Sequence, residues 1–247
     1  MAGAKQQQLE LIAPDWPAPP NVRAFATTRA GGVSKAPFDE LNLGDHVSDD
    51  SAAVTKNREL LVDASGLPEQ PLWLNQVHGN TVVEHASANA GTDADASWTA
   101  ASGKVCAVMT ADCLPLLLCN REGTRVAAVH AGWKGLEAGV IQNALEQFSG
   151  SEVLAWFGPV ISAPNYEIDQ KIFDHFVQLA EGNEDAFEFS RPGHYFFNLK
   201  MLARLILMRA GVTEIFDSRL CTFDDPRFYS YRRDGKTGRI ATLIWLD

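Results

Sequence analysis

The stretch from residue 105 to residue 135 holds two short apolar runs, and each run ends next to a residue that can ligate a metal. Residues 105–110 lead to Cys113, and residues 125–129 lead to His130. Both runs are rich in branched side chains and are bounded by small or polar residues, so the pattern predicts two buried strands rather than helices. Polar chemistry gathers where strands end, because loops project there from a rigid base. We therefore expect Cys113 and His130 to lie at a functional site.

A third apolar segment, residues 72–77, brings His78 to a Gly79-Asn80 turn in the same manner. Further strands are predicted at residues 22–28, 81–84 and 153–157, and ordered loops at residues 31–50 and 88–95. Apolar spacing and capping residues predict helices at residues 51–63, 136–148, 168–177 and 198–210, the last capped by Asn198. The chain is expected to end in a hairpin whose strands are residues 227–233 and 239–246.

Some predicted strands follow one another directly, whereas others alternate with helices. This mixture favours an α+β fold, a sandwich of mixed β-sheets flanked by helices, over a uniform Rossmann winding. A proline cluster at residues 14–20 predicts a stiff, extended entry to the domain. We expect an N-terminal extended segment over residues 1–20 and a single catalytic domain over residues 21–247.

Composition narrows the class of protein. Among the 247 residues, 46% are hydrophobic and 21% are charged, which is typical of soluble globular proteins. The formal net charge of −10 argues against a broad nucleic-acid or anionic-membrane surface, but a few arginines can still hold a small anion. No apolar run approaches the ~20 residues of a membrane span, and the N-terminus lacks the apolar core of a secretion signal. The four cysteines form no CxxC pair and suit a reducing compartment. We predict a cytoplasmic monomer that binds small molecules.

His78, Cys113 and His130 together offer two imidazoles and one thiolate. Three protein ligands on Zn²⁺ leave a fourth position for water or substrate, which is the catalytic rather than the structural pattern. Copper is the alternative metal, because two histidines, one cysteine and a distant methionine form the blue-copper ligand set, and Met109 lies nearby in sequence. A four-copper oxidase is not predicted, because the six histidines include no HxH pair.

Two other interpretations use the same residues. Cys113 can be a thiolate nucleophile with His78 or His130 as its base, as in cysteine hydrolases. The plainer alternative is structural, since a buried cysteine often acts as a small hydrophobe and a histidine after a strand is often a satisfied polar group. The spacings of 35 and 17 residues match no local metal motif, so the pattern by itself leaves these alternatives open.

Arginines near predicted strand ends are candidates for binding an anionic substrate. Arg29 follows the first predicted strand, and Arg232 and Arg233 lie in the hairpin. A guanidinium binds phosphate or carboxylate through two parallel hydrogen bonds. Adjacent strand residues face opposite ways, so only one of Arg232 and Arg233 is expected to face a given pocket. The plainer alternative for each arginine is a surface ion pair.

Several motifs, in order, resemble the YfiH-type family, which has been called laccase-domain or polyphenol oxidase, peptidoglycan editing factor and purine nucleoside phosphorylase. The motifs are NQVHGN at 75–80, TADCLP at 110–115 and HAGWKG at 130–135, with GGVS, LNLGDHVSDD, GTDADA, FGPVIS, YEID and FYSYRRDGKTGRIATLIWL elsewhere. The resemblance covers the chain from about residue 20 to its end. It implies a single α+β domain and a zinc site on His78, Cys113 and His130.

The resemblance also implies activities and substrates. These are phosphorolysis of adenosine, inosine and methylthioadenosine, and deamination of adenosine; copper-dependent phenol oxidation and hydrolysis of a peptidoglycan precursor are the alternatives. The expected small molecules are a nucleoside and phosphate. Arg29, one of Arg232 and Arg233, and Asn42 are then expected to bind them, with Asn42 hydrogen-bonding the nucleoside. A zinc-stabilised partner protein without enzymatic activity is a further alternative.

The chain departs from the family pattern at a few loop positions. Lys134 stands where the family commonly has arginine, which replaces a bidentate contact by a point charge. Ser48, Ser162 and Asp169 stand where glycine is expected. None of these changes removes an expected ligand, so we expect them to affect loop shape and substrate preference.

Overall fold

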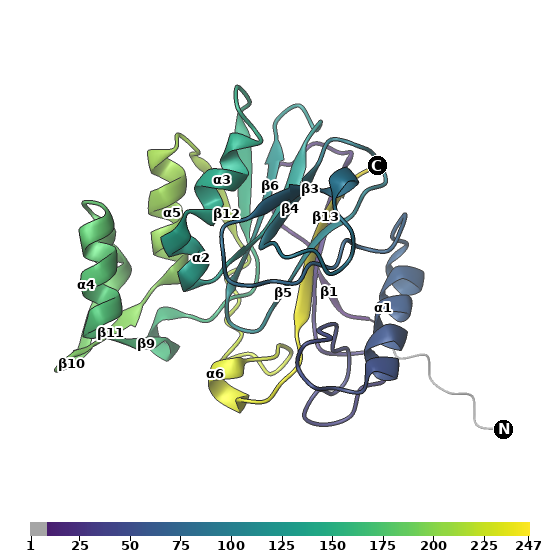
Figure 1. Cartoon of the computed structure of the whole chain (residues 1–247), viewed down its shortest axis with the longest axis horizontal. Coiled ribbons are helices and arrows are strands. Elements are labelled where there is room, and N and C mark those ends of the chain that lie inside the picture. The colour runs from purple at the N-terminus through teal and green to yellow at the C-terminus, as the bar shows by residue number, and fades with distance from the viewer. Residues whose placement is uncertain (1–8) are drawn as a thin grey trace.

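A computed structural model describes residues 9–247. Residues 1–8 of the predicted N-terminal segment lie outside the described residues. The fold has two central β-sheets packed face to face, with helices on both outer sides and a smaller sheet at one end (Figure 1). The fold is therefore the single α+β domain of mixed sheets predicted from the sequence.

The first central sheet has four antiparallel strands. Their order is β1 (Leu11–Ile12), β2 (Val22–Thr27), β13 (Ile240–Leu246) and β5 (Cys106–Thr110). The last strand of the chain thus lies between one of the first strands and the strand that precedes Cys113.

The second central sheet has six strands of mixed direction. Their order is β12 (Glu214–Asp217), β8 (Val153–Phe157), β6 (Leu114–Asn120), β7 (Val126–Ala131), β4 (Ala96–Thr99) and β3 (Val82–Glu84). The outer pairs β12–β8 and β3–β4 are parallel, and the inner pairs are antiparallel. Cys113 immediately precedes β6, and His130 lies in the neighbouring strand β7.

Alternation within continuous apolar strands explains how both faces of each sheet are buried. Along β6, Leu116 and Leu118 face the helices, whereas Leu117 and Cys119 face the other sheet. Successive side chains of a strand point to opposite faces, so a strand buried on both sides has no polar alternation. The core of the molecule therefore has three layers: one between the sheets and one outside each sheet.

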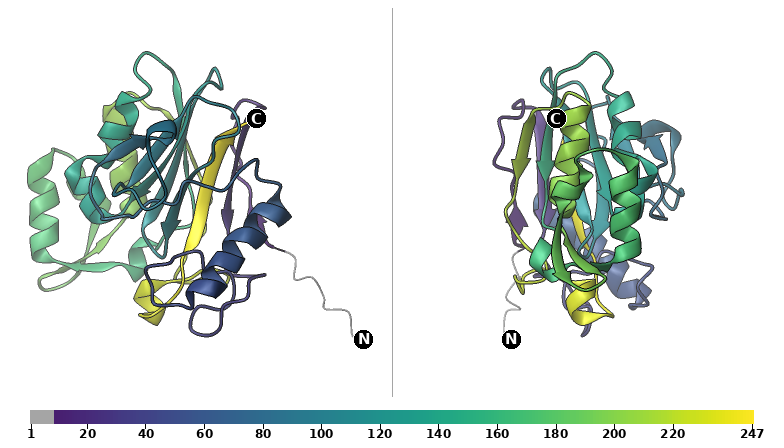
Figure 2. Two further views of the ribbon diagram at one scale, coloured as in Figure 1. Left: turned by 45° about the vertical axis from the view of Figure 1, so that its right-hand side comes forward. Right: turned by 90° about the vertical axis from the view of Figure 1, so that its left-hand side faces the viewer.

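Helix α1 (Ser51–Ser65) covers the outer face of the four-stranded sheet, where Leu61 packs with Leu243 and Trp245. The outer face of the six-stranded sheet is covered by α2 (Trp133–Ala138), α3 (Val140–Glu146) and α5 (Leu199–Arg209). Figure 2 shows α1 on the opposite side of the sandwich from these helices.

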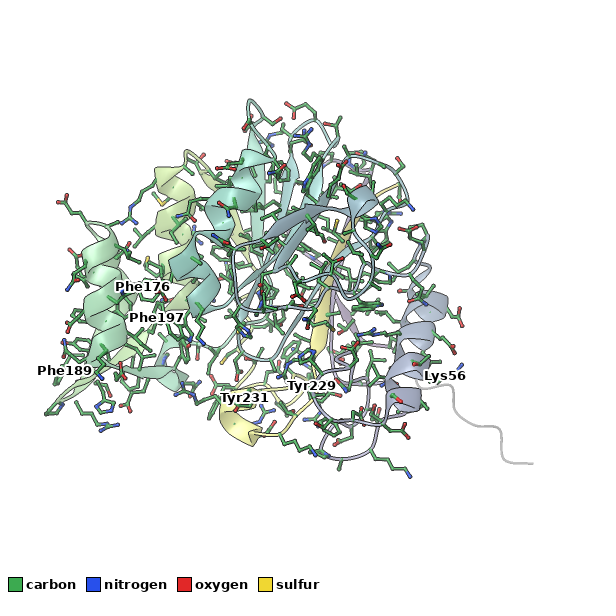
Figure 3. The ribbon with its side chains drawn as sticks, viewed as in Figure 1. Lys56, Phe176, Phe189, Phe197, Tyr229 and Tyr231 are labelled. Carbon is green, nitrogen blue, oxygen red and sulfur yellow. The ribbon has the colours of Figure 1, made fainter. Side chains whose placement is uncertain are left out.

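A smaller unit lies beyond α5. It consists of α4 (Gln170–Leu179) and the antiparallel sheet formed by β10 (Phe187–Arg191), β11 (His194–Phe197) and β9 (Glu167–Asp169). Phe176 and Phe197 join it to the main apolar cluster, on the inner side of α4 (Figure 3). Short 3-10 turns occur at His85–Ser87, Ala163–Asn165 and Asn183–Ala186, and a four-residue helix α6 spans Tyr231–Asp234. Within residues 9–247, no helix combines the length and apolarity that a membrane crossing requires.

Most of the predicted elements are confirmed. Strands β2, β3, β5, β7, β8 and β13 and helices α1, α4 and α5 lie where the sequence placed them, and Asn198 caps α5 by accepting a hydrogen bond from Met201 N. His130 lies inside β7 rather than after it. Strands β1, β4, β6 and β9–β12 were not predicted.

Two predictions were wrong. The helix expected at 136–148 is two helices, because Gly139 takes a left-handed conformation (φ 88°) that ends α2. The strand expected at 227–233 is absent, and the helix α6, Tyr231–Asp234, forms at the end of this segment instead. Ser230 caps α6 by accepting from Arg233 N, and the buried Asp112 carboxylate accepts hydrogen bonds from Ser230 Oγ and Arg232 N, so this segment folds around a side chain rather than along a neighbouring strand.

Candidate metal centre

His78, Cys113 and His130 converge on one point. One ligand atom from each residue can be chosen so that the three atoms lie within 4.8 Å of one another. The two imidazole rings meet edge to face, with 4.8 Å between their centroids. His130 is buried, Cys113 is half-buried and His78 is exposed, so the cluster opens to solvent on one side.

The donor set fits a zinc ion with an open coordination position. Zinc binds nitrogen and sulfur at about 2.0–2.3 Å, which places neighbouring ligand atoms of a tetrahedral site about 3.3–3.7 Å apart. The three atoms lie within 4.8 Å of one another, about 1 Å above that spacing, so modest side-chain adjustments would bring them to it. Three protein ligands leave the fourth position for water or substrate. The same donors also accept copper, which has a high affinity for nitrogen and sulfur sites.

Asp95 holds both histidines in place. Its fully buried carboxylate accepts a hydrogen bond from His130 Nδ1 at 2.8 Å, through Oδ1. A proton on Nδ1 leaves Nε2 of neutral His130 free to ligate a metal, which is how a carboxylate commonly orients a metal-binding histidine. Burial would raise the pKa of Asp95, but the hydrogen bond and charge of His130 and the backbone N–H groups lower it below its usual value.

The same carboxylate also organises the loop that carries His78. It accepts hydrogen bonds from the backbone N–H groups of Val77, His78 and Gly79 at 3.2, 2.9 and 2.6 Å. His78 has a left-handed backbone (φ 60°), which costs free energy for a non-glycine residue unless its surroundings hold it. Gln76 fixes the loop from the other side, since its amide donates to Met109 O and accepts from Met109 N at 2.8 and 2.7 Å.

Electrostatics favour a thiolate at Cys113. Burial would raise the pKa of the thiol, but the adjacent His130 and His78 lower it to about 6. For His130, burial would lower the pKa, but Cys113 and Asp95 raise it to about 9. Both shifts favour the thiolate–imidazolium form of the pair when no metal is bound. Metal binding needs the thiolate and releases the imidazolium proton.

Gly132 leaves room for the cluster. A Cβ atom at this position would lie 3.0 Å from Cys113 Sγ and 3.6 Å from His130 Nε2. Gly132 is also the residue that precedes α2. A side chain there would therefore point at the ligand atoms.

A cleft surrounds the exposed side of the cluster and has two lobes. His78, Ala111 and Tyr231 line both lobes, and Tyr231 lies on α6 at the edge of the molecule (Figure 3). One lobe, of about 360 Å³, is completed by Asp112, Cys113, Trp133, Lys134, Ile161, Tyr166, Leu199 and Arg232. The other, of about 260 Å³, is completed by His46, Gln76, Met109, Thr110, His130 and Arg239.

A larger hollow of about 820 Å³ lies elsewhere, lined partly by β12 and residues 12–17. None of the three clustered residues lines it. The candidate site is therefore the cleft at the cluster, although the remote hollow has the larger volume.

The structure brings one of the predicted anion-binding residues into the cleft. Arg232 lines the larger lobe with its guanidinium 5.0 Å from the centroid of the Tyr166 ring, and Nη1 donates to Glu167 O. Arg233 instead donates to the backbone carbonyls of Thr222, Phe223 and Phe228 and pairs with Asp234. Because Arg232 and Arg233 lie on a short helix, the strand-based reason for expecting only one of them in the pocket does not apply, although only Arg232 lines the cleft.

Arg29 and Asn42 lie in the framework beside the cleft. Arg29 donates to Asp39 O, pairs with the Asp39 carboxylate and lies over the ring of Tyr229. Asn42 is fully buried, and its amide is engaged with Gly44, Asp49 and the backbone N–H of Arg239. Neither residue lines either lobe, so their predicted contacts with substrate stay predictions.

Several residues of the site escaped the sequence reasoning. Asp95, Gln76, Tyr166 and Arg239 were not proposed as site residues, although all four occur in the motifs GTDADA, NQVHGN, YEID and the C-terminal run. An acidic residue beside a metal-binding histidine is the signal that would identify such a partner. Along the chain, however, 35 residues separate Asp95 from His130. Only the pairing of β4 with β7, which sets Ala96 opposite Val129, reveals that Asp95 and His130 are neighbours.

The fold and this site define an α+β protein with a two-histidine, one-cysteine cluster in an open cleft. Its chain belongs to the family described as multi-copper polyphenol oxidoreductase laccase, the YfiH family, whose model matches residues 23–247.

Relatives and solved structures of this family are similar over nearly the whole chain. A Pseudomonas aeruginosa protein named purine nucleoside phosphorylase is 50% identical over 96% of this chain and 98% of its own length. The Escherichia coli protein named purine nucleoside phosphorylase YfiH is 44% identical over 96% and 99%. The crystal structure of a Neisseria meningitidis protein is 48% identical and superposes with a TM-score of 0.92, covering 96% of this chain and 99% of that one.

Proposed function

We propose that this protein is a zinc-dependent purine nucleoside phosphorylase that acts on adenosine, inosine and methylthioadenosine and also deaminates adenosine. The observation that carries the proposal is the convergence of His78, Cys113 and His130, within 4.8 Å, on a cleft with an aromatic lobe. The names of the relatives support the phosphorylase activity, which we extend to this chain.

Neighbouring residues favour the protonation states of His130 and Cys113 that a divalent metal requires. Asp95 keeps the proton of His130 on Nδ1, and the lowered pKa of Cys113 keeps its sulfur deprotonated. When bound, zinc supplies a Lewis acid that polarises an oxygen atom at its open position.

The aromatic lobe is suited to a purine. Trp133 and Tyr166 provide ring surfaces, and Ile161 and Leu199 provide apolar walls. Burial raises the pKa of Tyr166, so its phenol stays neutral and can donate a hydrogen bond to a ring nitrogen. Arg232 at the rim of this lobe supplies a positive charge near the base.

In phosphorolysis, a phosphate oxygen forms a bond to the anomeric carbon of the ribose while the bond from that carbon to the purine nitrogen breaks. The purine leaves with the electron pair and takes a proton, and the products are the free base and ribose 1-phosphate. The residues of this chain hold the two reactants in the cleft and stabilise the negative charge of phosphate and of the departing base. In deamination, water adds to C6 of adenosine and ammonia leaves, so that reaction needs no phosphate.

Copper-dependent phenol oxidation is the second candidate, because the family description names that activity. Met109, the methionine considered as a copper ligand, packs in the core beneath α1, and its sulfur lies 3.9 Å from Arg58 Nη2. Within residues 9–247, the cluster at His78 is the single group of three or more histidine, cysteine or acidic ligands close enough to share an ion. Multicopper chemistry needs further copper ligands, so we favour the nucleoside reaction.

Metal analysis combined with activity assays tests the proposal. The protein is purified without added metal, its metals are measured by mass spectrometry, and the same sample is assayed with inosine plus phosphate, with adenosine and with a phenol. We expect stoichiometric zinc, phosphate-dependent release of free base, and loss of both zinc and turnover in Cys113→Ala. Cys221→Ala is the matched control, because Cys221 is half-buried but lies outside the cleft lining. Equal turnover in wild type and Cys113→Ala would refute the site, and phenol oxidation alone would favour copper.

A further inference from the structure

The two lobes of the cleft differ in chemistry. The larger lobe has the rings of Trp133 and Tyr166, and its charged residues include a carboxylate, Asp112. The smaller lobe is lined by one arginine, three histidines, a glutamine and a threonine among its polar residues, and by no carboxylate. His78 and Tyr231 line both, so the lobes meet at the candidate metal centre. The rings of the larger lobe suit an aromatic base, and the arginine of the carboxylate-free smaller lobe suits an oxyanion.

Arg239 is the unusual residue of the smaller lobe. Its Nη1 donates to the carbonyls of Thr237 and Gly238 at 3.1 and 2.9 Å. Over residues 9–247, Arg239 forms no ion pair with a carboxylate, and its Nε and Nη2 atoms have no hydrogen-bond acceptor. Burial lowers the pKa of Arg239 below its usual range, although the charges of Cys113, Asp112 and Tyr231 act to raise it.

Arg239 is half-buried, and a cation that is partly withdrawn from water without a paired carboxylate costs free energy. Two other half-buried arginines have a carboxylate partner: Arg233 pairs with Asp234, and Arg58 lies 3.4 Å from Asp45. Arg239 keeps part of its guanidinium available in the cleft instead. Two free N–H groups on one planar fork are the arrangement that binds an oxyanion through parallel hydrogen bonds.

The surrounding loop fixes Arg239 in this position. Asn42 Oδ1 accepts from Arg239 N at 2.9 Å, and Leu43 N donates to Arg239 O at 3.2 Å. Gly44 lies so close that a Cβ there would be 2.7 Å from Arg239 Cγ. The buried Asn42 therefore acts on the cleft through Arg239. His46 also lines this lobe, and its exposed imidazole has Nδ1 3.6 Å from Asp45 Oδ1, which leaves Nε2 for a hydrogen bond to the same anion.

We infer that Arg239, assisted by His46, forms the phosphate subsite of this cleft, and that the aromatic lobe beyond the metal centre takes the purine. The inference rests on the proposed phosphorolysis for the identity of the anion. It replaces Arg29 and Arg233 as phosphate ligands, because those two residues are engaged in the framework. Phosphate and nucleoside then approach the cluster from opposite lobes, which places the attacking oxygen and the departing base on different sides of the ribose.

Equilibrium binding of inorganic phosphate to the purified, metal-containing protein tests the subsite without nucleoside. Titration calorimetry or dialysis with labelled phosphate compares wild type with Arg239→Met, Arg239→Lys and Gly44→Ala. We expect Arg239→Met to weaken phosphate binding ~10- to 100-fold, since charge-assisted hydrogen bonds are lost. Arg239→Lys should weaken it ~5- to 10-fold, because the fork becomes a point charge. Arg204→Met is the matched control, since Arg204 lines the remote hollow, and its phosphate affinity should equal that of wild type.

Turnover provides the second readout. In Arg239→Lys the KM for phosphate should rise by the same factor as its dissociation constant, while adenosine deamination, which uses no phosphate, should stay within about twofold of wild type. If circular dichroism shows that Arg239→Met fails to fold, the phosphate affinities of Arg239→Lys and Gly44→Ala, both expected to be weaker than that of wild type, decide whether Arg239 binds phosphate.

Failure of the subsite and failure of the proposed function give different results. Wild-type affinity and KM for phosphate in the folded variants, or no phosphate binding by wild type, would overturn the subsite. Phosphate binding that depends on Arg239 in a protein that cleaves no nucleoside would leave the oxyanion site standing and overturn the phosphorylase proposal.

Discussion

Replacing Asp95 by asparagine tests whether one buried carboxylate builds the metal centre. The substitution keeps the shape of the side chain and removes its charge. Asp95 Oδ1 accepts from His78 N and His130 Nδ1, and Oδ2 accepts from Val77 N and Gly79 N. An asparagine amide has one oxygen and one NH₂ group, so one of these two pairs of donors must face another donor.

Either orientation of the amide damages the site. With NH₂ toward the loop, two backbone N–H groups lose their acceptor. With NH₂ toward His130, Nδ1 must accept, the imidazole proton moves to Nε2, and that nitrogen cannot ligate a metal. Losing two hydrogen bonds to a buried carboxylate costs about 3–5 kcal/mol of unfolding free energy, and second-shell changes of this kind lower metal affinity ~10- to 100-fold.

The assay is zinc competition with a chromophoric chelator, together with chemical unfolding of the metal-free and zinc-bound protein. Asp93→Asn is the matched control, because Asp93 is exposed and accepts from the side chain of Asn75 alone among side-chain donors in residues 9–247. Zinc affinity within twofold of wild type in folded Asp95→Asn would refute the role of Asp95 in orienting His130.

The pH dependence of the unfolding free energy gives a second test of the contribution of Asp95. The pKa of Asp95 is lowered in the folded state, so its contribution to stability is present above the unfolded-state pKa, ~4, and is lost as the pH falls through the folded-state value. The metal-free Asp95→Asn protein lacks this contribution. Its unfolding free energy should therefore fall less than that of wild type between neutral pH and about pH 3.

Three further predictions follow from single contacts. Gly132→Ala should lower zinc affinity ~10-fold or more while the fold is kept, because the new Cβ lies 3.0 Å from Cys113 Sγ; the zinc competition assay and circular dichroism check this. In the metal-free protein at pH 7.5, iodoacetamide should alkylate Cys113, whose pKa is about 6, far faster than the fully buried Cys106, whose pKa is about 12. The Cys113 rate should fall as the pH drops below about 6, since the thiolate becomes protonated, and zinc should protect it; mass spectrometry of peptides measures both effects. Tyr229→Phe removes a buried hydroxyl that donates to Phe38 O at 2.6 Å and should lower the unfolding free energy by about 1–3 kcal/mol, measured by urea unfolding, with zinc affinity unchanged.

Local sequence signals predicted the elements whose stability is local. Helix α5 was located from its apolar spacing and its cap Asn198, and both are properties of neighbouring residues. Strand β6 was missed even though its sequence, LPLLLCN, is almost entirely apolar. The residues on its two sides, Leu116 toward the helices and Leu117 toward the other sheet, face different layers, and no short-range pattern separates such a strand from other buried segments. The C-terminal helix α6 was missed because Asp112, more than 100 residues away in the sequence, holds it.

The residues of the candidate site also divide into those that the sequence predicts and those that only the fold reveals. The soft ligands His78, Cys113 and His130 could be named in advance because their chemistry is rare and each follows an apolar segment. The residues that make those ligands useful, Asp95 and Arg239, are ordinary charged residues in sequence. Their roles depend on burial that only the assembled sheets provide.

Asp112 connects the two halves of the site. Its left-handed backbone (φ 86°) turns the chain from β5 into Cys113. Its buried carboxylate accepts from Thr222 Oγ1, Ser230 Oγ and Arg232 N, at 2.6, 3.0 and 2.7 Å. One residue thus sets the turn that presents the thiolate and anchors the helix that carries Arg232 and Tyr231 over the cleft. A change at Asp112 should therefore disturb the metal centre and the rim of the cleft together, whereas a change at Asp95 should act on His130 and the loop that carries His78 and leave α6 in place.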